Sequence, residues 1–150
     1  MGRRLFKELE RSYGFDEVAI VPGQVTINPE LTSTKMTIGD LEFEIPIMAS
    51  AMDGAVSPGF ASYMHEMGGL GVLNAEGLYS RYEDPYSVLE EIISCPQESV
   101  TEFLQKVYSE PIREELIGQR VREIKNTGAT CAVSFTPQNK IGRASCRERV

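Results

Sequence analysis

Residues 45–74 read IPIMASAMDGAVSPGFASYMHEMGGLGVLN and carry, in order, the patterns of a strand, a loop, a helix, a glycine turn and a second strand. Residues 45–49 and 70–73 are apolar runs of strand length. Ser57 followed by Pro58 predicts the start of a helix, because serine caps the free N–H groups and proline costs nothing at the first helical position. Glycines 68 and 69 predict its end, since glycine accepts the left-handed conformation that closes helices.

The predicted helix has an apolar face, and both predicted strands are apolar on both faces. The spacing of Phe60, Ala61, Met64 and Met67 places these four side chains on one side of the helix. A strand–helix–strand unit with such strands is typical of a parallel sheet covered by helices.

Further strand signals lie upstream of this unit. Residues 18–21 are a short strand candidate that ends at Pro22. Residues 36–38 and 41–45 alternate in polarity on either side of a Gly-Asp pair, which predicts a β-hairpin.

Downstream, three helices and a third strand are expected. Asp84 and Pro85 predict the start of the first helix, Ser99 and Glu102 form a capping-box pattern for the second, and Pro111 opens the third. The predicted core positions of these helices are Val88, Leu89, Ile92, Ile93, Phe103, Leu104, Val107, Ile112, Leu116, Val121 and Ile124. Gly128 ends the third helix, residues 129–135 form a strand, and residues 136–139 form a loop.

Composition narrows the class of protein. The 150 residues are 41% hydrophobic and 25% charged with a net charge of -7, which is ordinary for one globular domain and disfavours nucleic-acid binding. No apolar stretch is long enough to span a membrane, and the N-terminus lacks a secretory signal, so a cytoplasmic location is expected. Cys95, Cys131 and Cys146 are odd in number and far apart, which predicts reduced thiols and no metal site.

Four segments together resemble the IMP dehydrogenase / GMP reductase superfamily. They are residues 47–54 (IMASAMDG), 68–74 (GGLGVLN), 16–22 (DEVAIVP) and 77–85 (GLYSRYEDP). The last is most similar to the branch of IMP dehydrogenase-related proteins that lack CBS domains. The resemblance covers residues 13–139.

The resemblance implies an α/β fold, the N-terminal portion of a (β/α)8 TIM barrel with about three inner parallel strands and a β-hairpin before them. Since a full barrel needs ~200–250 residues, residues 1–139 are expected to be part of one, without CBS domains, and inactive alone. Residues 140–150 read like a translated sequencing-library adapter, so we expect a non-native tail. This prediction would be wrong if an independent clone carried the same tail.

The resemblance also implies an activity for the intact protein. It would oxidise IMP to XMP with NAD in guanine nucleotide synthesis, as a homotetramer, with a monovalent cation such as potassium. Two alternatives stay open: a GMP reductase that uses NADPH and forms IMP, and a purine-nucleotide-binding relative without turnover.

Active sites of such barrels lie at the carboxyl ends of the strands. In the family, the Ser and Met of the first motif touch the nucleotide, which here are Ser50 and Met52. From the residues alone, Ser50 could instead satisfy backbone groups and Met52 could fill the core. Asp53 is either catalytic or, as we favour, holds the loop by accepting backbone N–H groups. Gly54 and Asn74 complete the candidate site, and Asn74 departs from the histidine of many relatives.

No catalytic residue is assigned within this sequence. The family's nucleophilic cysteine attacks the purine C2 from a loop beyond residue 139, so Cys95 and Cys131 are expected to be buried structural thiols. Residues 68–71 do not fit a dinucleotide-binding turn, because there the glycines precede a helix, whereas here they precede a strand. His65 is expected on the surface of its helix.

Overall fold

The computed structural model of the protein describes residues 10–136, which fall into two units divided after Ser33. In the first unit, the chain is extended apart from a turn at residues 15–17 and one 3-10 turn, η1 (Pro29–Leu31), which is capped by the Asn28 side chain. The prediction of a strand at residues 18–21 is wrong. No strand pairing forms there within the described residues, and Ile20 is fully exposed.

The second unit begins with the predicted hairpin. Strands β1 (Met36–Ile38) and β2 (Leu41–Phe43) pair antiparallel, with Thr37 opposite Glu42. Gly39 has a φ of 60°, a conformation that glycine adopts without strain. The hairpin prediction is confirmed, although its second strand stops two residues earlier than expected.

A three-stranded parallel sheet follows, in the order β3-β4-β5. Its strands are β3 (Met48–Ala49), β4 (Leu70–Asn74) and β5 (Ala132–Ser134). The prediction of three parallel strands is confirmed, but β3 and β5 are shorter than expected. Pro46 explains why β3 begins later than predicted, because proline has no N–H to donate to a strand ladder. β5 begins where Ala132 comes opposite Val72.

Helix α1 (Pro58–Glu66) connects β3 to β4, and its predicted ends are confirmed. The Ser57 side chain accepts the N–H of Phe60, and Gly68 lies at a φ of 81° after the last turn. The N–H groups of Gly68 and Gly69 bond the carbonyls of His65 and Met64, which is the Schellman arrangement of a helix end. Of the predicted apolar face, Ala61 is buried and Met64 half-buried, but Phe60 and Met67 are exposed.

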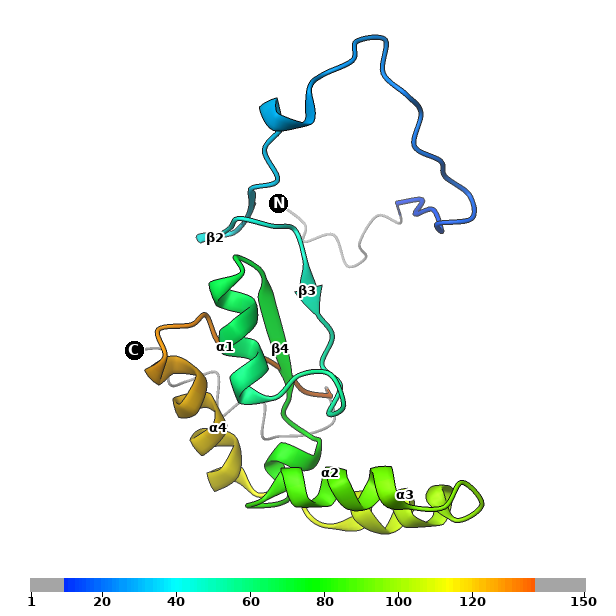
Figure 1. The fold of residues 1–150 in the computed structure, drawn as a ribbon, viewed down its shortest axis with the longest axis vertical. Helices are drawn as coiled ribbons and strands as arrows, with labels where there is room; N and C mark the ends of the chain where they lie inside the picture. The colour runs from blue at the N-terminus through cyan, green and yellow to red at the C-terminus, as the bar shows by residue number, and fades with distance from the viewer. Residues whose placement is uncertain (1–9, 137–150) are drawn as a thin grey trace, which may run out of the picture. The chain divides into compact units, whose positions relative to one another are not determined.

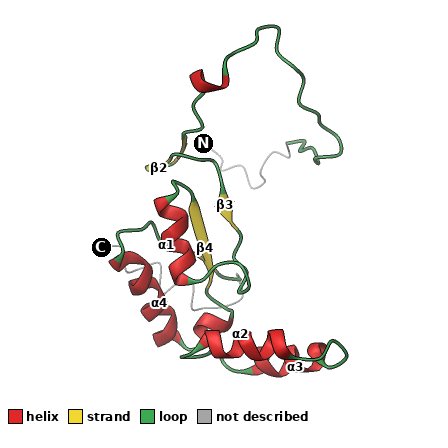
Figure 2. Cartoon of the chain, viewed as in Figure 1, coloured by secondary structure: helices red, strands yellow, loops and turns green. Residues whose placement is uncertain are grey.

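Three helices connect β4 to β5: α2 (Pro85–Ser94), α3 (Val100–Ser109) and α4 (Glu114–Asn126). Figures 1 and 2 show α1 beside β4 and α4 beside α1, with α2 and α3 beyond the carboxyl end of β4. The core lies between α1, α4 and the sheet, and its buried members are Val56, Ala61, Leu73, Tyr79, Ile124 and Ala129. Gly71 permits this packing, because a Cβ there would meet the Ala61 backbone at 2.7 Å.

Several helix predictions need correction. Ser99 precedes α3 as expected but makes no capping bond, because its hydroxyl bonds the Pro96 carbonyl instead. The helix α4 starts at Glu114 and not at Pro111, since the Arg113 N–H is held by the Ser80 carbonyl in an extended segment. Ile93 is 82% exposed, so it does not belong to the core.

Candidate functional site

The carboxyl ends of the three parallel strands lie at one edge of the sheet, so the segments that follow them are neighbours. Residues 50–54, here called the β3 loop, follow β3. Residues 75–78, called the β4 loop, follow β4 and lead into a 3-10 turn, η2 (Leu78–Ser80). Thr136 lies two residues after β5. The sequence predicted strand ends before Ser50 and at Asn74 and a loop at residues 136–139, and the structure agrees with this, although residues 137–139 lie outside the described residues.

The β3 loop presents two of the predicted site residues to solvent. Ser50 is exposed, and Met52 is 58% exposed. Met52 does not fill the core, so that alternative for its side chain is wrong. The loop is a tight turn in which the Met52 carbonyl accepts the N–H groups of Ala55 and Val56, each at 2.9 Å. Gly54, the next predicted residue, is exposed in the same turn.

Asp53 differs from its neighbours because it is only 8% exposed. Its Oδ2 accepts the N–H of Leu78 at 3.1 Å and the hydroxyl of Tyr108 at 2.6 Å. Asp53 therefore accepts a backbone N–H, as the favoured interpretation expected. The donor, however, belongs to the β4 loop and not to the β3 loop that carries Asp53. Its Oδ1 is buried without a hydrogen-bond partner within the described part of the chain.

Gly77 gives the Asp53 carboxylate its space. A Cβ at position 77 would overlap both carboxylate oxygens, so any other residue there would force the acid out of its place. The carboxylate thus fits between the two loops only because the second loop has a glycine at this point.

The β4 loop is also tied to the end of β5. Thr136 donates its backbone N–H and its hydroxyl to Glu76 Oε1, at 2.9 and 3.0 Å, and Ala75 donates its N–H to the Ser134 carbonyl. Asn74 Oδ1 accepts the N–H of Glu76 at 3.1 Å, so its side chain shapes the turn. The three strand ends are therefore linked in sequence, β3 to β4 and β4 to β5.

Two tyrosines next to the loops, Tyr79 in η2 and Tyr108 in α3, keep their phenolic protons well above neutral pH. Burial is the main cause that raises the pKa of Tyr79 to about 12, with smaller contributions from Tyr86 and Asp53. Burial, followed by the hydrogen bond to Asp53, also raises the pKa of the Tyr108 phenol. Both phenols are therefore hydrogen-bond donors at physiological pH.

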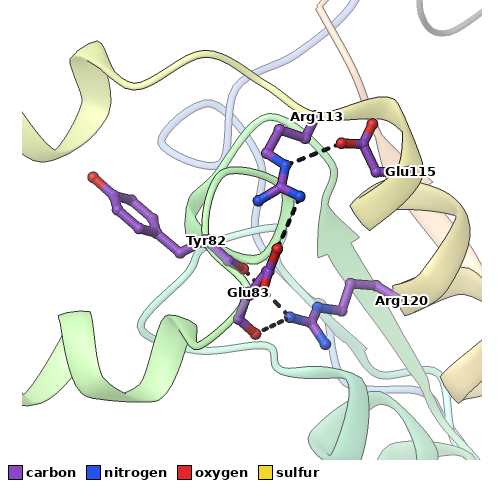
Figure 3. A network of polar contacts seen from close by, with 5 residues as sticks. All are labelled: Tyr82, Glu83, Arg113, Glu115 and Arg120. Carbon is purple, nitrogen blue, oxygen red and sulfur yellow. Dashed lines mark hydrogen bonds and ion pairs between the residues drawn. The ribbon is translucent and has the colours of Figure 1, made fainter.

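A polar network holds the segment after η2 against α4 (Figure 3). The Arg120 guanidinium, on a residue 7% exposed, donates to the backbone carbonyls of Tyr79, Tyr82 and Glu83. The Glu83 side chain in turn bonds Arg113 at 3.0 Å, and Arg113 also bonds Glu115. The network therefore ties η2 and the residues after it, which continue the β4 loop, to α4.

Cys95 and Cys131 lie outside the three strand-end loops, and Cys146 lies outside the described residues. Cys95 follows the last residue of α2, and Cys131 immediately precedes β5. Both are half-buried and not fully buried as expected, and burial raises the pKa of Cys131. Within residues 10–136, no group of three or more His, Cys, Asp or Glu side chains could hold a metal ion. None of the helices in that range has the length and apolar character needed to cross a membrane.

Four residues of this site escaped the sequence analysis: Glu76, Gly77, Tyr108 and Thr136 as a partner of Glu76. Local patterns do not reveal them, because Asp53 and Tyr108 are 55 residues apart and Glu76 and Thr136 are 60 apart. The signals available for Gly77 were its place three residues after the end of β4 and its position at the start of the motif of residues 77–85.

Comparison with known proteins gives a consistent result. The sequence profile of the IMP dehydrogenase / GMP reductase domain matches residues 12–90. An uncharacterized oxidoreductase of Mycolicibacterium smegmatis is 37% identical over 134 residues, which are 86% of this chain and 36% of the relative. The inosine-5'-monophosphate dehydrogenase of Methanocaldococcus jannaschii is 33% identical over 67 residues, covering 45% of this chain and 14% of the relative.

A solved structure resembles the fold as well. It is the crystal structure of an IMP dehydrogenase/GMP reductase-like protein from Corynebacterium glutamicum, with a TM-score of 0.80 and 31% identity. The match covers 91% of this chain and 38% of that chain. The chain thus spans little more than a third of the proteins that it matches over most of its length.

Proposed function

This chain belongs to the IMP dehydrogenase / GMP reductase family, and we propose that the whole protein oxidises IMP to XMP with NAD. The observation that carries the proposal is the β3 loop. An exposed serine hydroxyl and an exposed methionine thioether stand two residues apart at the carboxyl end of a barrel-type strand. Membership of the family supports the proposed redox activity, and the exposed β3 loop supports the proposed binding of a nucleotide.

Ser50 and Met52 fit a purine nucleotide by their chemistry. A hydroxyl can donate to a phosphate or ribose oxygen, and a thioether packs against the flat face of a base. Asp53 and Gly77 would hold the loop in place while the nucleotide is bound. The role of these residues is to bind and orient the nucleotide.

The dinucleotide would be held by other parts of the protein. NAD would supply the hydride acceptor when bound, but no residue of the described range is assigned to it here. The same holds for the proposed potassium ion, and the nucleophilic cysteine that the family uses is expected beyond residue 139. We also propose that the intact protein is a homotetramer, which sedimentation of the full-length protein would test.

The strongest competing function is GMP reduction. Both activities appear in the description of the family profile and in that of the resembling crystal structure. Asn74 favours a third possibility, nucleotide binding without turnover, because it replaces a histidine of many relatives and its side chain serves the local turn.

An assay of the full-length protein separates these functions. The protein is given IMP with NAD and, separately, GMP with NADPH, and nicotinamide absorbance is followed. We expect turnover only in the first mixture. Turnover only in the second would assign GMP reductase, and tight nucleotide binding without turnover in either would assign the binding protein.

A further inference from the structure

The carboxylate of Asp53 joins the β3 loop to a helix far along the chain. Tyr108 lies in the last turn of α3, and its hydroxyl reaches Asp53 Oδ2 at 2.6 Å. The Leu78 N–H is the second donor to the same oxygen, at 3.1 Å. Since Asp53 Oδ1 is buried without a partner in the described part of the chain, these two donors carry the polar anchoring of the acid.

The ring of Tyr108 is held in turn by Arg81. The Arg81 guanidinium carbon lies 5.9 Å from the centre of the ring, and its Nε donates to the Glu76 carbonyl at 3.1 Å. The other end of the guanidinium bonds the Glu110 carbonyl, just after α3. Arg81 thus contacts the ring of Tyr108 and Asp53 bonds its hydroxyl. Tyr108 belongs to α3, which is part of the helical connection between β4 and β5.

We propose that Tyr108 is a positioning residue of the nucleotide site, which acts through Asp53 to hold Ser50 and Met52 in their binding arrangement. This inference rests on the function proposed above. Asp53 directly follows Met52, and the turn around it is closed by the bonds of Ala55 and Val56 to the Met52 carbonyl. We therefore expect a shift of the Asp53 carboxylate to strain this turn and to displace Met52.

Removal of the Tyr108 hydroxyl should loosen this arrangement. A buried carboxylate oxygen that loses one of two donors is left partly unsatisfied, which is costly in a buried place. The loop can relieve that cost by moving the carboxylate toward water. Ser50 and Met52 would then occupy their binding positions for less of the time.

A purely structural contact would behave differently, and Tyr82 provides the matched control. Its hydroxyl donates to the Val107 carbonyl at 2.9 Å, so it anchors the same turn of α3. Within residues 10–136, this hydroxyl makes no hydrogen bond to the β3 loop. Tyr108→Phe and Tyr82→Phe thus each remove one hydroxyl that fixes α3, but only the first removes a bond to Asp53.

The experiment compares both variants with the wild type in the full-length protein. Amide hydrogen exchange at Ala55 and Val56 is measured without nucleotide, IMP is titrated, and thermal melting is recorded. For Tyr108→Phe we expect faster exchange at both amides. We also expect the KM for IMP to rise about 3- to 30-fold while kcat changes less, because only part of the free energy of the lost hydrogen bond to the carboxylate reaches the binding site. For Tyr82→Phe we expect a lower melting temperature with exchange and KM unchanged.

The outcomes separate the two claims. If wild-type protein binds IMP and Tyr108→Phe binds it equally well, the positioning role is wrong while the proposed function stands. If wild-type protein binds no purine nucleotide, the proposed function fails, and the exchange at Ala55 and Val56 still decides whether Tyr108 holds the loop. Equal exchange in wild type and Tyr108→Phe, or equal acceleration in both variants, overturns the inference.

Discussion

The Glu76 carboxylate and Thr136 join the ends of the second and third parallel strands: Oε1 accepts both the N–H and the hydroxyl of Thr136, at 2.9 and 3.0 Å. Together with the Asp53–Leu78 bond, this pair makes one connected rim of three strand ends. A rim of this kind holds the strand-end loops in register with the sheet, which a binding site built on such loops requires.

Glu76→Ala should therefore weaken the full-length protein. It removes an acceptor of two hydrogen bonds, and we expect a loss of about 1–3 kcal/mol in the free energy of unfolding. Urea denaturation measures this loss. Glu98→Ala, at an exposed position between α2 and α3, is the control and should change stability by less than about 0.5 kcal/mol. Equal effects of the two variants would contradict the role of the rim.

Arg120 should be among the least replaceable residues of α4. Its guanidinium satisfies three backbone carbonyls and bonds Glu123 at 2.8 Å while nearly buried. Arg120→Ala leaves these acceptors unsatisfied, and we expect a loss of about 3–5 kcal/mol. Arg120→Lys should recover only part of it, because one ammonium cannot reproduce the fork of donors.

Arg122 is the matched control, since it is an exposed arginine on the same helix. Arg122→Ala should unfold at nearly the wild-type urea concentration. The account of the Arg120 network would be wrong if Arg120→Ala unfolded at the same urea concentration as Arg122→Ala.

Stability should fall in alkaline solution because of two tyrosines. The pKa of Tyr79 is raised from 10.0 to about 12 by burial, and that of Tyr108 is raised as well. A raised folded-state pKa gives stability that is complete below the unfolded pKa near 10.0 and is lost as the pH rises through the folded value. The free energy of unfolding should therefore decline between pH 10 and pH 12.

Tyr108→Phe should make that decline less steep, since phenylalanine does not titrate. Urea unfolding at several alkaline pH values measures the slope. An identical slope in wild type and Tyr108→Phe would show that this phenol is not held protonated by the fold.

Local signals in the sequence predicted much of this fold. Ser57 with Pro58, Gly68 with Gly69, and Asp84 with Pro85 mark helix ends correctly, because capping depends on neighbours in the chain. Predictions failed where distant contacts compete. The Ser80 carbonyl delays the start of α4, and the Ser99 hydroxyl turns back to Pro96 and makes no cap.

The candidate site was predictable in its location but not in its internal bonds. The motif of residues 47–54 and the strand-end rule led to the β3 loop and its exposed serine and methionine. The partners of Asp53 could not be found in this way, because Tyr108 reaches it from a helix 55 residues later. The burial that separates Asp53 from its exposed neighbour Met52 is likewise a product of the tertiary fold.

The central claim is that the β3 loop binds a purine nucleotide, and Ser50 and Ser57 offer a matched pair of tests. Ser50→Ala removes an exposed hydroxyl at the strand end, whereas Ser57→Ala removes the cap of α1. The second variant should lose about 1 kcal/mol of stability and keep its affinity for IMP. Met52→Ala should weaken binding as Ser50→Ala does, because packing against the base is lost.

The decisive measurement is a titration of full-length wild-type, Ser50→Ala and Ser57→Ala protein with IMP, alongside thermal melting of each. A hydrogen bond to a charged group contributes about 1.5–3 kcal/mol, so Ser50→Ala should weaken IMP binding roughly 10- to 150-fold with little change in melting temperature. Unchanged IMP affinity together with a much lower melting temperature for Ser50→Ala would contradict the account and leave this loop a structural one.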